Sequence, residues 1–236
     1  MPLFVHKAKF DANKKQIWDW YNSDGAFRRI MPEWEGIQPI NAGRLVDGDE
    51  TIFKVKMGPL RQKWVARHHS VVPGESFADR MIKGPFGAWN HHHEFESRTG
   101  EVTSVIDNVE YKLPLHIFTG WSAGFTVLPR MKQMFEFRSV RVANDLKQIQ
   151  ATAKLPRQRI LVSGSTGMIG LQLCAFLEAA GHDVHRLLRP STKLPSDVDS
   201  SKVVKWNDLT GEILEGDMNG FDSIIHLAGA GIGDKR

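Results

Sequence analysis

The chain's 236 residues are enough for one large domain or two modest ones, and its 41% hydrophobic and 25% charged residues are usual for a globular protein. Its net charge of +4 is spread along the chain without a block of like charges, which argues against a nucleic-acid partner. No apolar run is long enough to span a membrane, and the single cysteine, Cys174, excludes an internal disulfide and suits a reducing compartment, so we expect a cytoplasmic protein with no membrane partner.

The first half of the chain is predicted to be rich in β-strands, with a helix near each end. Leu3–Phe10 has a strand pattern, and Asp11 or Asn13 is placed to cap the helix that follows. Between residues 41 and 100, short runs alternate with turn signals that contain glycine or proline, which predicts an antiparallel meander. Residues 129–149 change to helical spacing, and Pro129 suits the first turn of that helix.

The second half alternates between strands and helices. Residues 153–158, a basic stretch with a proline, are interpreted as a linker between a domain of residues 1–152 and a second domain of residues 159–236. The predicted elements are strand Arg159–Ser163, helix Met168–Ala180 with Gly181 as its cap, and strands Asp183–Leu188, Val203–Trp206 and Ser223–Leu227. This order is typical of an α/β Rossmann fold, a doubly wound parallel sheet. Cys174 falls within the apolar part of the helix and is expected to be buried.

Three glycines, Gly164, Gly167 and Gly170, mark the junction between the first strand and the first helix of this half. Their spacing lets the backbone approach a diphosphate and directs helix N-terminal N–H groups at its charge. The alternative is a tight turn that holds no ligand. Arg189 ends the second strand, where an NAD-specific domain more often has an acidic residue, and an arginine there suits the 2′-phosphate of NADP. The alternative for Arg189 is an ordinary exposed arginine.

The glycine spacing, Arg189 and the segment His226-Leu-Ala-Gly229 together resemble the extended, epimerase-like branch of the short-chain dehydrogenase/reductase family. The resemblance implies an NAD(P)-binding domain, with NADP favoured over NAD and with Asp208 and Leu209 beside the adenine. The cofactor-binding residues that it implies are Gly164, Ser165, Thr166, Gly167, Met168, Ile169, Gly170, Arg189, Leu209, Leu227, Ala228 and Gly229.

No catalytic residue can be assigned from this resemblance. The family uses a tyrosine with a lysine four residues later for proton transfer. The two tyrosines of the chain, Tyr21 and Tyr111, precede the glycine turn and are followed at that distance by Gly25 and Leu115. A sheet that stops at its fourth strand would also leave one edge bare. We therefore expect a truncated chain, the front part of a longer enzyme, with an incomplete Rossmann domain and no activity alone.

Several segments of the first half carry a second resemblance: residues 27–34, 57–60 and 84–86, and the pattern Trp89-x-His-x-His-x-Phe95. With the order of strand, helix, meander and closing helix, they resemble the polyketide-cyclase/START-like superfamily (SRPBCC), in the version fused ahead of an epimerase-like domain. The resemblance implies an α+β helix-grip fold, in which a curved sheet wraps a long helix and encloses a cavity for a hydrophobic small molecule.

Strand alternation predicts which side chains line that cavity. Trp89, His91, His93 and Phe95 share one face of a strand, and Asn90, His92 and Glu94 share the other. The expected cavity-lining residues are Trp64, His68, Trp89, His91, His93 and Phe95. The alternative is that these histidines are hydrogen-bonded core or surface residues. A zinc ion shared by His91 and His93 would need a further ligand that the spacing does not identify, so no metal site is predicted.

These features support two hypotheses of different class. The first is an epimerase/dehydratase-like, NAD(P)-dependent oxidoreductase with a fused domain that gathers a hydrophobic substrate. The second is a non-catalytic binding protein for a lipid-like molecule with a remnant nucleotide fold, which the missing Tyr–Lys pair favours.

Overall fold

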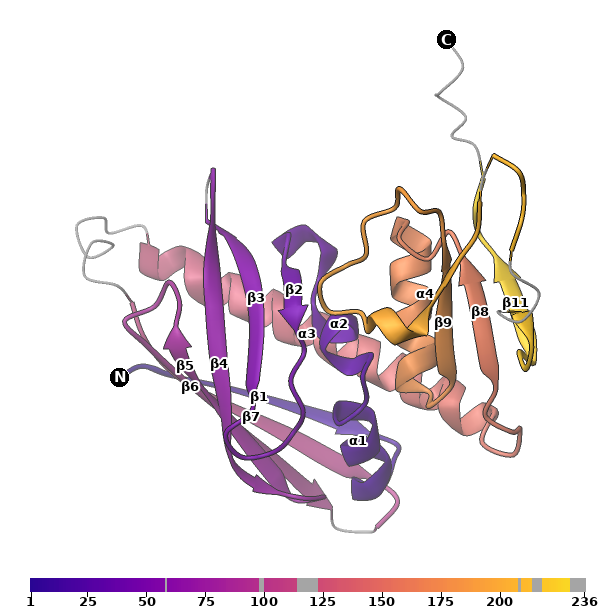
Figure 1. Cartoon of the computed structure of the whole chain (residues 1–236). Helices are drawn as coiled ribbons and strands as arrows, with labels where there is room; N and C mark the ends of the chain where they lie inside the picture. The colour runs from indigo at the N-terminus through magenta and orange to yellow at the C-terminus, as the bar shows by residue number, and fades with distance from the viewer. Residues whose placement is uncertain (58, 98–99, 114–122, 208, 214–217, 230–236) are drawn as a thin grey trace.

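The computed structural model describes residues 1–57, 59–97, 100–113, 123–207, 209–213 and 218–229. Two β-sheets follow one another along the chain (Figure 1), a seven-stranded sheet in the first half and a four-stranded sheet in the second. The long helix α3 (Ala123–Ala151) lies across the first sheet and leads into the second region.

The chain opens with β1 (Leu3–Phe10) and α1 (Lys14–Tyr21). Asn13 caps α1, because its side chain accepts a hydrogen bond from the backbone N–H of Gln16 at 2.9 Å. The Gln16 side chain in turn accepts one from the backbone N–H of Asn13 at 3.0 Å. This reciprocal pair satisfies two N–H groups at the helix start. The predicted strand and the predicted capped helix are both confirmed.

The first sheet is an antiparallel meander that β1 closes by pairing with the last strand. Its order is β1-β7-β6-β5-β4-β3-β2. Between β1 and the meander lie α1, α2 (Ala26–Ile30) and the 3₁₀ turn η1 (Glu33–Glu35). The strands are β2 (Gln38–Asn41), β3 (Glu50–Met57), β4 (Leu60–Val72), β5 (Ser76–Lys83), β6 (Ala88–Ser97) and β7 (Thr103–Lys112).

Helix α3 packs its apolar face against this sheet. Met131, Phe135, Val142 and Leu146 recur at helical spacing and are all buried. The prediction that Pro129 lies in the first turn is wrong, because the helix begins at Ala123 and Pro129 lies inside it. Val127, on the N-terminal side of Pro129, also packs against the core, so tertiary contacts hold the helix on both sides of the proline. A sheet wrapped around a long helix is the expected helix-grip arrangement.

The second sheet is parallel, with the order β10-β9-β8-β11. Its elements are β8 (Arg159–Ser163), α4 (Met168–Ala179), β9 (Asp183–Leu188), the 3₁₀ turn η3 (Ser200–Lys202), β10 (Val203–Lys205) and β11 (Ser223–His226). Gly181 follows α4 with φ +83°, a conformation that favours glycine. The strand order corresponds to the first four strands, 3-2-1-4, of a doubly wound sheet with the order 3-2-1-4-5-6. Among the described residues one α-helix, α4, packs on this sheet, so the doubly wound fold is seen in part.

Helix α4 also packs against the first region. A Cβ atom on Gly25, just before α2, would lie 1.8 Å from the Ala175 carbonyl oxygen in α4. Ala179 of α4 belongs to the same buried cluster as Phe10 and Trp20. In Figure 1, α4 lies between α2 and the parallel strands. The two regions therefore share core contacts.

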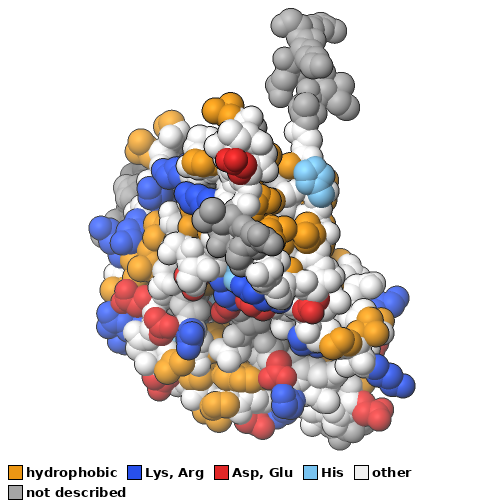
Figure 2. Space-filling model, turned by 45° about the vertical axis from the view of Figure 1, so that its right-hand side comes forward, with side chains coloured by type: hydrophobic (Ala, Val, Ile, Leu, Met, Phe, Trp, Pro, Cys, Tyr) orange, Lys and Arg blue, Asp and Glu red, His pale blue; other side chains and the backbone are white. Residues whose placement is uncertain are grey.

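The surface charge is mixed. On the face drawn in Figure 2, Lys and Arg side chains are interspersed with Asp and Glu rather than gathered in one patch. In the part of the chain that the structure describes, none of the helices combines the length and the apolar character needed to cross a bilayer.

Candidate functional site

The turn after β8 requires glycine at two positions, because the surrounding backbone leaves no space there for a side chain. Gly164 has φ +66°, and a Cβ atom there would lie 2.6 Å from the backbone carbon of Leu227. A Cβ on Gly170 would lie 2.2 Å from the carbonyl oxygen of Gly164. Real Cβ atoms do not approach backbone so closely, so any larger residue at either position would displace the turn from β11 or from α4.

Gly167 is different, because the protein leaves space beside it. It is the N-cap of α4 and is exposed, and a Cβ there would meet one described atom within 4 Å, the Gly164 carbonyl oxygen at 3.3 Å. Beyond it, the first residues of α4, Met168 and Ile169, are 79% and 66% exposed. The backbone of this turn is thus open to an outside group at the N-terminal, positive end of a helix.

The other cofactor-binding candidates lie around this end of the sheet. Leu227, Ala228 and Gly229 follow β11 directly, and the first two touch the glycine turn. Arg189 follows β9 and is exposed. Leu209 is 93% exposed on the segment after β10, the edge strand, and Asp208 lies outside the described residues. Ser165 is fully buried and Thr166 half-buried within the turn.

A contact not anticipated from the sequence joins the same strand ends. The Ser163 hydroxyl lies 2.7 Å from Nδ1 of His226, which places a polar bridge between β8 and β11 beside the glycine turn. Parallel pairing of the two strands brings these residues opposite each other.

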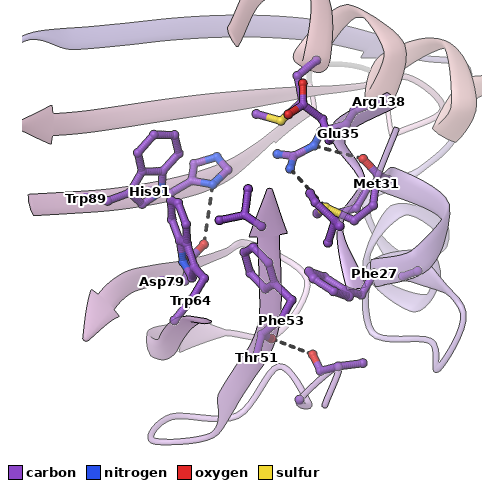
Figure 3. Close-up of a pocket in the computed structure, with 18 of the residues that line it drawn as sticks. Phe27, Met31, Glu35, Thr51, Phe53, Trp64, Asp79, Trp89, His91 and Arg138 are labelled. Carbon is purple, nitrogen blue, oxygen red and sulfur yellow. Dashed lines mark hydrogen bonds and ion pairs between the residues drawn. The ribbon is translucent and has the colours of Figure 1, made fainter. Parts of the chain in front are cut away.

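The first region encloses a cavity of about 500 Å³ between its sheet and α3 (Figure 3). Five of the six predicted lining residues, Trp64, His68, Trp89, His91 and His93, do line it. Phe95 does not. It is 1% exposed and packs with Phe77 and Trp18 in the core beside the cavity, because β6 continues past the cavity under α1.

Two histidines and two aspartates gather at one wall of the cavity, and we call Asp79, His91, His93 and Asp107 the histidine–aspartate cluster. Nε2 of His91 lies 3.1 Å from Oδ1 of Asp107, and Nδ1 of His93 lies 2.6 Å from the same oxygen. The second contact has a poor angle for a hydrogen bond. On the other side, Oδ2 of Asp79 lies 3.5 Å from Nδ1 of His91 and 3.9 Å from Nε2 of His93.

Burial sets the protonation behaviour of this wall. It lowers the pKa of His93 to about 4, with a further contribution from the nearby His91. Burial alone would raise the pKa of Asp107, but the imidazoles of His93 and His91 hold it well below its usual range. Burial, followed by the carboxylate of Asp107, raises the pKa of Tyr21. We therefore expect neutral His93, ionised Asp107 and neutral Tyr21 near pH 7.

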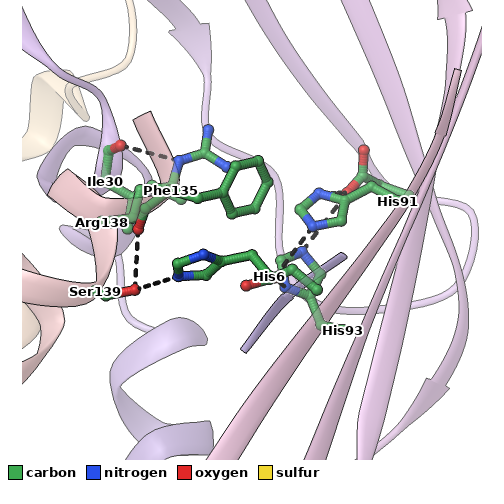
Figure 4. Close-up of polar contacts among 9 residues, drawn as sticks. His6, Ile30, His91, His93, Phe135, Arg138 and Ser139 are labelled. Atoms are coloured by element: carbon green, nitrogen blue, oxygen red, sulfur yellow. Dashed lines mark hydrogen bonds and ion pairs between the residues drawn. The ribbon is translucent and has the colours of Figure 1, made fainter. Parts of the chain in front are cut away.

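A half-buried cation faces the cavity from α3. The Nε of Arg138 donates a hydrogen bond to the Ile30 carbonyl oxygen at 3.2 Å, and its guanidinium lies 4.9 Å from the ring centre of Phe135 (Figure 4). Burial lowers the pKa of Arg138. Beside it, His6 and the Ser139 hydroxyl are 2.8 Å apart.

Asp79, Asp107 and Arg138 were not predicted from the sequence. One signal was present for Asp107, because strand alternation puts it on the inward face of β7 between Val105 and Val109, where a carboxylate is unusual. Arg138 lies three residues after Phe135 on the inward face of α3. Asp79 follows Phe77 in the same way on β5.

Comparison with known proteins places the second region in a family. Residues 160–236 match the NAD dependent epimerase/dehydratase family, so the C-terminal region contains an epimerase-family domain, and this family implies a nicotinamide cofactor. Over 77 residues the chain is 32% identical to an epimerase family protein of Mycobacterium bovis and 31% identical to one of Mycobacterium leprae. These stretches are 33% of this chain and 24% and 23% of the two relatives.

A solved structure resembles both regions together. The crystal structure of a nucleoside-diphosphate sugar epimerase from Corynebacterium glutamicum matches with a TM-score of 0.74 and 27% identity, covering 96% of this chain. The match covers 46% of that chain, so this protein spans about half of it. The helix-grip region followed by an epimerase-family region is therefore an arrangement that also occurs in a solved epimerase.

Proposed function

We propose that this chain binds a nicotinamide dinucleotide at the turn between β8 and α4, as part of an epimerase-like oxidoreductase, and that it prefers NADP to NAD. The observation that carries the proposal is the contrast between the glycines. Gly164 and Gly170 are required by backbone contacts of 2.6 Å and 2.2 Å, whereas a Cβ atom on Gly167 would make one milder contact, 3.3 Å from the carbonyl oxygen of Gly164. A ligand whose diphosphate lies against the start of α4 explains why position 167 has no side chain.

The residues around the turn fit such a ligand. The N–H groups at the start of α4 would hold the diphosphate, Leu227–Gly229 would border the nucleotide, and Arg189 would bind the 2′-phosphate of NADP. The nicotinamide would supply hydride transfer when bound. Neither tyrosine lies at this turn, since Tyr21 lines the cavity and Tyr111 packs in the core of the first region. No acid–base residue is proposed for that step.

Titration of the chain with NADPH and NADH, followed by the fluorescence of the reduced nicotinamide, tests the proposal. We expect saturable binding of NADPH and weaker binding of NADH. Gly167→Asp should remove binding and leave the circular dichroism spectrum unchanged, because the new carboxylate repels the diphosphate while its Cβ atom requires only a small shift of the Gly164 carbonyl group. Gly170→Ala is the comparison that should lose binding and stability together. Failure of the folded wild-type chain to bind either nucleotide would refute the proposal.

The cavity supports a second function for the first region, the binding of a hydrophobic small molecule. Its volume of about 500 Å³ falls in the range of small-molecule sites, and aromatic side chains such as Phe53, Trp64 and Trp89 line it. An apolar fluorescent probe should bind to the chain, and Ala66→Trp, which fills the cavity, should abolish binding. His92→Trp adds the same ring on the outward face of β6 and should leave binding unchanged. Equal binding by both variants would contradict this function.

A further inference from the structure

The inner side of the histidine–aspartate cluster presents three ligand atoms to one point. One ligand atom from each of Asp79, His91 and His93 lies within 4.8 Å of the other two, and Oδ2 of Asp79 faces Nδ1 of His91 and Nε2 of His93. The separations from Asp79, 3.5 Å and 3.9 Å, are long for hydrogen bonds. They are close to the spacing of two ligands on one ion, which is about 3.4 Å for bonds of about 2.1 Å at a tetrahedral angle. The three atoms therefore leave room for a cation between them.

The opposite side of the cluster orients the two rings. Asp107 contacts Nε2 of His91 and Nδ1 of His93, the nitrogens that face away from Asp79. A carboxylate on the far nitrogen of a metal-binding histidine is a common supporting contact, since it fixes the tautomer and directs the free nitrogen at the ion. Here Asp107 is hydrogen-bonded to His91 and lies 2.6 Å from Nδ1 of His93, so one carboxylate contacts both rings. The rings stand 3.8 Å apart on alternate positions of β6, so the strand itself sets their spacing.

The charges of the histidine–aspartate cluster also favour a bound cation. Asp79 and Asp107 bring two carboxylates to a wall where His91, His93 and Asp107 are buried. Within the described ranges, the ion-pair partners of these carboxylates are the two histidines alone. Buried carboxylates are normally paired with cations or bound to metal ions. Arg138 acts on both carboxylates from a greater distance. A divalent cation between the two imidazoles would lie in direct contact with Asp79.

We propose that Asp79, His91 and His93 form a binding site for a divalent transition metal ion of the zinc type, oriented by Asp107. Two imidazole nitrogens and one carboxylate oxygen favour Zn²⁺, Fe²⁺ or Co²⁺ over Mg²⁺ and Ca²⁺, which prefer oxygen ligands. All three ligands line the cavity, so the remaining coordination positions face it. The site would take an oxygen donor, such as a carboxylate or an enolate, on an otherwise apolar molecule.

Equilibrium dialysis of the tag-free chain against Zn²⁺ tests the site, with the bound metal measured by atomic emission. We expect one Zn²⁺ per chain, and visible absorption bands of a nitrogen- and oxygen-bound ion when Co²⁺ replaces it. Asp79→Asn and His93→Gln should each weaken Zn²⁺ binding by about 100-fold or more, and Asp107→Asn by about 10–100-fold. His92→Gln is the matched control, because this neighbour points to the outward face of β6, and it should bind as the wild type does.

Thermal unfolding separates loss of metal from loss of fold. Zn²⁺ should raise the Tm of the wild type and of His92→Gln, and should leave the Tm of folded Asp79→Asn and His93→Gln unchanged. Absence of Zn²⁺ and Co²⁺ binding by the folded wild type would overturn the proposal. Equal metal binding by the ligand variants would overturn it too. Neither result bears on the nucleotide titration.

Discussion

Arg29 of α2 and Asp145 of α3 form a buried ion pair, with side chains 8% and 3% exposed. The Nε of Arg29 donates to Asp145 at 2.8 Å, and its Nη1 donates to the Gln172 side chain of α4 at 3.0 Å. One guanidinium thus joins helices from both regions of the chain.

Removing one partner of this pair should destabilise the whole chain. Arg29→Met leaves Asp145 buried without its partner, so the free energy of unfolding should fall by about 3–5 kcal/mol. The double variant Arg29→Met/Asp145→Leu removes both charges and should recover much of the loss. Urea denaturation of the three proteins measures both effects. A double variant no more stable than Arg29→Met would show that the loss came from packing rather than from the unpaired carboxylate.

Gly25→Ala should loosen the contact between α2 and α4. The added methyl group would collide with the Ala175 carbonyl, so we expect a loss of about 3 kcal/mol, the upper end for overpacking. Gly87→Ala is the control, since its nearest atom would lie at 3.2 Å and the site is exposed. Thermal unfolding should show a large decrease in Tm for the first variant and a small one for the second. A similar Tm for both would mean that the helices can separate freely.

Because of Cys174, we expect the free energy of unfolding to decrease at alkaline pH. Burial is the main cause that raises the pKa of this thiol from 9.0 to about 11. Below about pH 9 the thiol is protonated in both states. Between about pH 9 and 11 only the unfolded chain releases the proton, so stability falls as the pH rises, by up to about 2–3 kcal/mol. Cys174→Ala should lack this part of the slope. Rapid reaction of the folded thiol with a disulfide reagent at pH 8 would contradict the burial.

Arg189→Ala should change the cofactor preference. Loss of a guanidinium from the 2′-phosphate should weaken NADPH binding by about 10-fold, about 1.4 kcal/mol, with little effect on NADH. Parallel titrations of both nucleotides measure the ratio. An equal decrease for both nucleotides would place Arg189 outside the 2′-phosphate site.

The elements that could be predicted are those marked by neighbouring residues in the sequence. The bounds of β1, β8 and β9 follow from local strand patterns. The sequence offered Asp11 or Asn13 as the cap of α1, and Asn13 is the cap in the structure. The start of α3 was predicted too late in the chain, because proline is common in the first turn of a helix. The residues before Pro129 are held by contacts with the core, and a helical pattern in the sequence does not reveal such contacts. The division into domains at residues 153–158 and the cofactor-binding residues stay predictions.

The composition of the candidate sites could be predicted only in part from such sequence patterns. Alternation along β6 placed His91 and His93 on the inward face, but Asp79 comes from β5 and Asp107 from β7. These four residues come together because β5, β6 and β7 pair in a particular register. The alternation of residues along a single strand gives no information on that register. Phe95 shares the inward face and still misses the cavity, because the cavity ends before the strand does.

The close approach at Gly25 has a mechanical consequence. Residues on either side of it, Asp24 and Ala26, border the cavity, while its own backbone rests on α4, the helix whose first residues form the glycine turn. Because there is no space between Gly25 and α4, a movement of α2 is passed on to α4. Any ligand that displaces α2 outward must also displace α4, so we expect binding in the cavity and binding at the glycine turn to change each other's affinity by the same factor.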